Sequence, residues 1–144
     1  MTEQPAPPRA FGVRVPFPTR WRDNDQYGHL NNAVYYEAMD TAVNAWMIRY
    51  AGLDPRGGGP IALCAASSCE FRASAGFPEA LEIGIGIDRL GDSSVTWALG
   101  ILRAGEAEPI ATGRFVHVFV DAASRRPTAV PASVRTAIEE HLIV

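Results

Sequence analysis

An aspartate, a glycine and two asparagines follow one another closely in the first quarter of the chain. Asp25 is followed by Gly28 and then by Asn31 and Asn32, and asparagine favours the N-cap of a helix. The first backbone N–H groups of a helix lack intrahelical partners and lie at the positive end of its macrodipole. Such groups suit an oxygen that gains negative charge during acyl transfer. Asp25 beside this terminus is therefore a candidate nucleophile or general base.

The same residues also have a structural interpretation. Aspartate and asparagine cap helices and glycine occurs in turns, so the pattern D-x-x-G-x-x-N-N also fits a turn that leads into a helix. His29 lies within this segment and could carry a proton near neutral pH or stabilise the turn with a hydrogen bond. Both interpretations stay open on these residues alone.

A second acid competes with Asp25 for the catalytic role. Asp40 lies eight residues after Asn32, beside apolar positions of the expected helix, where an acid needs a partner or a function. A solvated acid on the helix surface is the alternative interpretation.

The elements that would position these groups follow from hydrophobic periodicity. Apolar residues at steps of three and four predict a helix over residues 32–51; they are Tyr35, Met39, Ala42, Trp46 and Tyr50. Alternation near residues 13–17 predicts an edge strand before this helix. Later runs predict strands over residues 61–73, 81–88, 95–103 and 110–121 and a helix over residues 131–142. This order describes an α+β fold in which one long helix packs on a curved antiparallel sheet.

The segment from Arg20 to Tyr35 resembles the signature D-x-D-x-x-G-H-x-N-N-x-x-Y of hotdog-fold thioesterases of the 4-hydroxybenzoyl-CoA thioesterase-like family. The segments at residues 70–72, 90–96 and 111–121 resemble the later strands of that family, so the resemblance covers residues 13–140. It implies the hotdog fold and the hydrolysis of an acyl-CoA or a related acyl thioester. It also implies a homodimer or homotetramer with sites between subunits. We expect the reaction to need no metal and no bound cofactor.

The resemblance also assigns roles to individual residues. It implies that Asp25 is the nucleophile or base and that the backbone N–H of Asn32 holds the oxyanion. We expect the substrate to be contacted by Gly28, His29, Asn31 and Tyr35, with Tyr35 shaping the acyl pocket. A sister branch of these thioesterases uses a helix carboxylate as its base at the position of Asp40. Relatives often have Glu at that position and Arg at position 43, whereas this chain has Asp40 and Val43.

Two other functions stay open. One is a hotdog hydratase or dehydratase, but proteins of that kind share a D-x-N-P-x-H pattern, whereas this chain reads Asp25-Gln-Tyr-Gly-His29. The other is a non-catalytic protein that binds acyl thioesters or acts as a scaffold. Such a protein would be expected to lack the acid, and Asp25 is present.

Composition bounds the remaining possibilities. The 144 residues fit a single domain, expected over residues 11–144 after a disordered tail at residues 1–10. A net charge of −3 provides no basic surface for nucleic acid. No apolar run approaches the roughly 18 residues that span a membrane. Cys64 and Cys69 lie an odd number of positions apart, which predicts side chains on opposite faces of one strand and free thiols. These features together predict a cytoplasmic protein.

The remaining titratable residues are not expected to form a metal site. The three histidines lie in different predicted elements, and no spacing resembles a zinc or iron site. His117 is predicted to be a core or interface histidine, and His141 a solvated one. Three arginines on or beside the predicted strands are candidates for contacts with coenzyme A phosphates; they are Arg72, Arg89 and Arg114.

Overall fold

The computed structural model describes residues 11–142 and confirms the predicted α+β class. The elements are β1 (Val13–Pro18), η1 (Trp21–Asp23), α1 (Asn32–Tyr50), β2 (Ile61–Phe71), β3 (Ala80–Leu90), β4 (Ser94–Arg103), β5 (Pro109–Val120) and α2 (Ala132–His141). Every predicted helix and strand is present, with ends that differ by at most two residues. The predicted tail at residues 1–10 lies outside the described residues.

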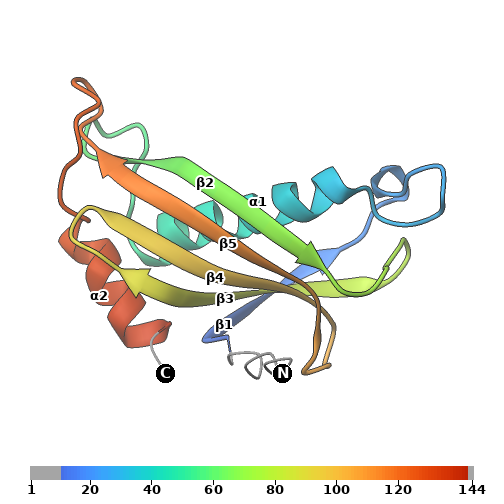
Figure 1. Cartoon of the computed structure of the whole chain (residues 1–144). Coiled ribbons are helices and arrows are strands. Elements are labelled where there is room, and N and C mark those ends of the chain that lie inside the picture. The colour runs from blue at the N-terminus through green and yellow to red at the C-terminus, as the bar shows by residue number, and fades with distance from the viewer. Residues whose placement is uncertain (1–10, 143–144) are drawn as a thin grey trace, which may run out of the picture.

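The strands form one five-stranded sheet in the order β1-β3-β4-β5-β2, in which all neighbours are antiparallel. β1 is an edge strand, as predicted, and β2 forms the other edge. Figure 1 shows α1 lying along one face of the sheet, with α2 at the end of the sheet away from the N-terminus of α1. This is the long helix on an antiparallel sheet that characterises the hotdog fold.

The core lies between α1 and the sheet. Alternate residues of β4 (Val95, Trp97, Leu99 and Ile101) are fully buried against the helix, as their alternation predicts. The rings of Trp46 on α1 and Trp97 on β4 meet edge to face with centroids 6.0 Å apart. The apolar stripe was wrong at its last position, because Tyr50 is 67% exposed. Tyr50 borders an open groove between β1 and the last turns of α1 instead of packing under the sheet.

The two cysteines lie on the same face of β2, so the prediction of opposite faces was wrong. Cys64 pairs with His117 and Cys69 with Gly113 on β5, and the register shifts between Cys64 and Ala66. A bulge adds one residue to one strand, so it reverses the alternation beyond it. Both thiols are free, because roughly four strand positions, about 13 Å, still separate them.

His117 is a core histidine, as predicted. Its side chain is buried, and the indole Nε1–H of Trp97 donates a hydrogen bond of 2.8 Å to its Nδ1. Burial lowers the pKa of His117, and the negative charge of Asp40 opposes that shift. His117 is therefore neutral and satisfies the only polar side-chain atom of Trp97.

Candidate active site

Asp25 lies in a tight turn between η1 and α1. The backbone N–H of Tyr27 donates to Asp25 Oδ1 at 2.8 Å, and the N–H of His29 does so at 3.4 Å. The backbone of Asp25 pairs with His29 through a bond of 2.8 Å. Gly28 closes this turn with a φ of 80°, a conformation that glycine adopts without strain. One carboxylate oxygen therefore shapes the turn, while Oδ2 has no hydrogen-bond partner among residues 11–142.

The N-terminus of α1 leaves one backbone donor open. Asn31 is the N-cap, and its side-chain oxygen accepts from the N–H of Ala33 at 2.9 Å. The carbonyl of Asn31 accepts from the N–H of Val34, also at 2.9 Å. The N–H of Asn32, the first helical residue, has no acceptor in the described part of the chain. A free donor at the positive end of a helix is suited to hold an anionic oxygen.

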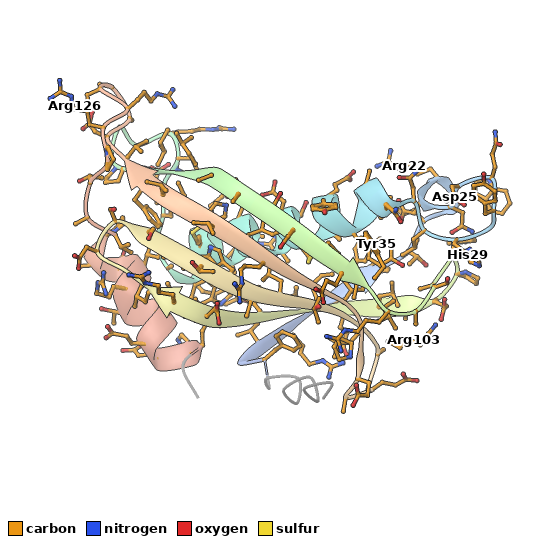
Figure 2. The ribbon with its side chains drawn as sticks, viewed as in Figure 1. Arg22, Asp25, His29, Tyr35, Arg103 and Arg126 are labelled. Carbon is orange, nitrogen blue, oxygen red and sulfur yellow. The ribbon has the colours of Figure 1, made fainter. Side chains whose placement is uncertain are left out.

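These groups line one cavity of about 330 Å³. Its walls come from the Asp25 turn, the first turn of α1 and the end of β2; they are Asp25, Tyr27, His29, Leu30, Asn32, Tyr35, Phe71, Arg72, Ala73 and Ser74. Figure 2 shows Asp25, His29 and Tyr35 gathered at this end of the molecule. Two larger cavities, of about 520 and 510 Å³, lie on the outer face of the sheet and between β1 and α1, and neither is lined by Asp25 or Asn32.

Tyr35 forms an apolar wall of this cavity. It is 3% exposed, and its ring meets Phe71 edge to face at 5.0 Å. Burial raises the pKa of Tyr35, although a backbone hydrogen bond from Ala75 opposes the shift. The phenol is therefore neutral and suits the uncharged part of a ligand.

The structure does not bring Asp40 together with Asp25. Asp40 is exposed, and its carboxylate accepts a hydrogen bond of 3.1 Å from Asn44 on the same helix. It lies about 12 Å along the helix axis from Asn32, at 1.5 Å per residue, and does not line the cavity. Burial and the charge of Asp40 both raise the pKa of the Cys64 thiol. The catalytic role that the resemblance suggests for Asp40 stays a prediction.

The other predicted residues divide between the cavity and its support. Gly28 and Asn31 do not line the cavity; they shape the turn and cap the helix. Of the three candidate arginines, Arg72 lines the cavity, while Arg114 pairs with Asp88 at 2.9 Å on the outer face. Arg89 is exposed and does not line the Asp25 cavity.

The sequence patterns did not predict the contribution of the end of β2 and the residues that follow it. Phe71, Ala73 and Ser74 line the cavity although they lie more than forty residues after Asp25. No spacing in the chain points to them, because pairing within the sheet brings them to the helix terminus. The register of β2 on β5 would have indicated that these residues lie beside the N-terminus of α1.

The described residues form neither a metal site nor a membrane-spanning helix. Between residues 11 and 142, no three His, Cys, Asp or Glu side chains gather in a way that could hold a metal ion. In the same range, no helix has the length and apolar character that crossing a membrane requires.

The chain is similar to several solved structures. It is 45% identical to the PA5185 protein from Pseudomonas aeruginosa strain PAO1, with a TM-score of 0.88 and 92% of each chain covered. A thioesterase from Thermus thermophilus, solved with coenzyme A and Zn, is 27% identical with a TM-score of 0.74 and covers 91% of this chain and 94% of its own. A search of curated proteins found no significant match.

A more distant structure shares the fold. The 1,4-dihydroxy-2-naphthoyl-CoA thioesterase from Synechocystis is 18% identical, with a TM-score of 0.79 over 88% of this chain and 95% of its own. The family profile described as the Thioesterase-like superfamily matches residues 19–138, a range that contains the Asp25 turn, α1 and the whole of β2 to β5. The chain is therefore a hotdog-fold member of the Thioesterase-like superfamily and a thioester hydrolase.

Proposed function

We propose that this protein hydrolyses an acyl-CoA thioester to the free acid and coenzyme A, with Asp25 as nucleophile or general base. One observation carries the proposal: Asp25 and Asn32 line the same cavity. Among the described residues, one carboxylate oxygen of Asp25 has no hydrogen-bond partner and the backbone N–H of Asn32 has no acceptor. The thioesterase from Thermus thermophilus was solved with coenzyme A, which supports a coenzyme A ester as the substrate class.

The carboxylate of Asp25 can start the reaction in two ways. As a nucleophile it attacks the thioester carbonyl, expels the thiolate and forms a mixed anhydride that water then hydrolyses. As a general base it takes a proton from water, and the resulting hydroxide attacks the same carbonyl. Both routes consume one water and release the acid and the thiol.

The negative charge that develops on the carbonyl oxygen is held by the helix terminus. The N–H of Asn32 donates to this oxygen, with the macrodipole of α1 behind it. One such donor is worth about 3 kcal/mol of transition-state stabilisation. His29 lies beside the carboxylate and contacts the polar part of the substrate, while Tyr35 and Phe71 border its acyl group.

The phosphates of coenzyme A require positive charge near the cavity mouth. Arg72 lines the cavity, and among residues 11–142 its guanidinium has no hydrogen-bond partner. We therefore assign it to the phosphates.

A thiol-release assay tests the proposed function. The protein is incubated with a panel of aliphatic and aromatic acyl-CoA esters, and free thiol is measured over time, with and without a metal chelator. We expect turnover of at least one ester and no effect of the chelator. Hydration of a 2-enoyl-CoA without any hydrolysis would indicate the hydratase, and binding of esters without turnover would indicate the binding protein.

We also propose that the active protein is a homodimer or a larger homo-oligomer. β2 is an edge strand of eleven residues, and most of them are exposed. A long open edge presents unpaired backbone groups that another strand can use. Phe71 at the end of this strand and Arg72 just after it line the Asp25 cavity, so a second chain on this edge would border the site. Sedimentation should give a dimer or larger, and a fully active monomer at assay concentration would contradict this.

A further inference from the structure

The segment between β2 and β3, residues 72–79, supports the turn that carries Asp25. The N–H of Leu30 donates to the carbonyl of Ala75 at 2.8 Å, and the N–H of Phe77 donates to Asn24 Oδ1 at 3.0 Å. The two backbones approach closely at Gly76, where an added Cβ would lie 2.9 Å from the carbonyl oxygen of Gly28. These contacts flank Asp25 in the sequence on both sides.

The support segment is held by Glu79 and Arg103. Arg103 Nε donates to Glu79 Oε1 at 2.8 Å, and Arg103 Nη2 donates to the carbonyl of Ser74 at 2.7 Å. The other oxygen of Glu79 accepts from the N–H of Gly76 at 2.8 Å. The ion pair therefore ties both ends of residues 74–79 to the last residue of β4. Figure 2 shows Arg103 at the same end of the molecule as Asp25 and Tyr35.

This ion pair is not placed to contribute much to global stability. The side chains of Arg103 and Glu79 are 34% and 36% exposed, and pairs at such exposure usually contribute little to the free energy of unfolding. A small displacement of residues 75–77 would nevertheless move Asn24 and Leu30 and, with them, the carboxylate between. Catalytic rates are sensitive to such shifts, since about 1 Å of misplacement can cost a hundredfold.

We propose that Glu79 and Arg103 are positioning residues that hold the Asp25 turn in register with the N-terminus of α1 through residues 74–77. The proposal rests on the proposed catalytic role of Asp25. It assigns to the ion pair an effect on turnover that exceeds its effect on folding.

The chain contains a matched control a few residues away. Glu82 on β3 accepts from Arg14 Nη2 at 2.7 Å and from the N–H of Gly105 at 3.2 Å. Like Glu79, Glu82 therefore accepts hydrogen bonds from one arginine and from one glycine N–H. The side chains of Arg14 and Glu82 are 30% and 24% exposed. The Arg14–Glu82 pair braces the turn between β4 and β5, where Arg14 Nη1 donates to the carbonyl of Glu106 at 2.8 Å. Arg14 Nη2 also reaches the main-chain carbonyl of Arg103 at 3.4 Å. Within residues 11–142, neither side chain of the pair bonds to the guanidinium of Arg103, to residues 72–79 or to the Asp25 turn.

The experiment compares Glu79→Gln with Glu82→Gln, which change the net charge equally. We expect kcat of Glu79→Gln to fall about tenfold or more, with KM changed less than kcat, while Glu82→Gln stays within about twofold of wild type. Thermal melts should show similar small shifts for both. Equal losses of kcat in the two variants would overturn the proposal.

A double variant shows whether the effect passes through Asp25. If Glu79 acts only by positioning that carboxylate, Glu79→Gln should change the residual rate of Asp25→Asn by less than about twofold. An equal fold-loss in both backgrounds would overturn the proposal. A fully active Asp25→Asn would instead overturn the proposed function, so the two failures are distinguishable. If Glu79→Gln does not fold, Arg103→Lys, which replaces the two separate donor nitrogens by one ammonium, carries the same test with Arg14→Lys as its control.

Discussion

Polar groups near the N-terminus of α1 differ in their hydrogen bonding from those packed under the middle of the same helix. In the middle, the indole N–H of Trp97 beneath Trp46 is bonded to His117, and the surrounding side chains are buried. At the N-terminus, the N–H of Asn32 and one oxygen of Asp25 have no partner among the described residues, and both residues line a cavity. In the middle of the helix, packing supplies an acceptor for the buried indole N–H, whereas two polar groups at the N-terminus are left for a ligand to satisfy. The site thus lies where the core ends.

The sharpest test of this comparison is to substitute Asp25 and Asp40 in turn. Asp25→Asn keeps an oxygen that accepts from Tyr27 and therefore preserves the turn, but it removes the charge. We expect kcat to fall at least about a hundredfold with little change in the melting temperature. Asp40→Asn should cost much less, because Asp40 lies outside the cavity. The reverse ranking in equally stable proteins would favour the helix-carboxylate mechanism and leave Asp25 as a turn residue.

The open donor can be removed without removing the helix. Asn32 is the first helical residue, where proline is well tolerated, and the φ of −60° and ψ of 140° at Asn31 suit a residue before proline. Asn32→Pro should therefore fold and lose about a hundredfold or more in kcat. Asn32→Ala changes the side chain but keeps the N–H, so it should retain most of the activity. Similar rates for both variants would argue against the Asn32 N–H as an oxyanion donor.

A substitution in the core should lower stability and leave kcat nearly unchanged, the opposite of the variants at the site. Trp97→Phe removes the donor to His117 and leaves a void in a fully buried position. We expect a loss of about 2 kcal/mol or more in the free energy of unfolding, measured with denaturant. At a temperature where the variant is folded, kcat should stay within about twofold of wild type. A large fall in kcat at full folding would show that the two regions are coupled.

The smallest expected effect concerns pH. Burial lowers the pKa of His117 in the folded protein, so the unfolded chain takes up the proton first as pH falls. The stability that the neutral imidazole contributes is present above the ordinary pKa of about 6.5 and declines as pH falls below it. His117→Asn keeps an acceptor but does not titrate. Its unfolding free energy should depend less on pH than that of wild type between about pH 6.5 and 5, and equal slopes would contradict this.

Local patterns were sufficient to predict much of the fold. The steps of three and four from Tyr35 to Trp46 predicted α1, and the alternation from Val95 to Ile101 predicted the buried face of β4, because one element meets the core with a fixed period. The asparagine cap at Asn31 predicted where α1 begins, since it satisfies donors only a few residues away. Asp25 and Asn32, the residues proposed for the chemistry, were likewise within reach of the sequence.

Only the tertiary structure decided how distant segments meet. The bulge between Cys64 and Ala66 depends on pairing with β5 and reverses the faces of the residues beyond it, so alternation alone placed the cysteines wrongly. The wall that Phe71 to Ser74 add to the cavity and the bonds from Arg103 to the segment after β2 join residues far apart in the chain. Sequence determines elements through interactions between near neighbours, whereas these contacts depend on sheet register and loop closure, which no local period encodes.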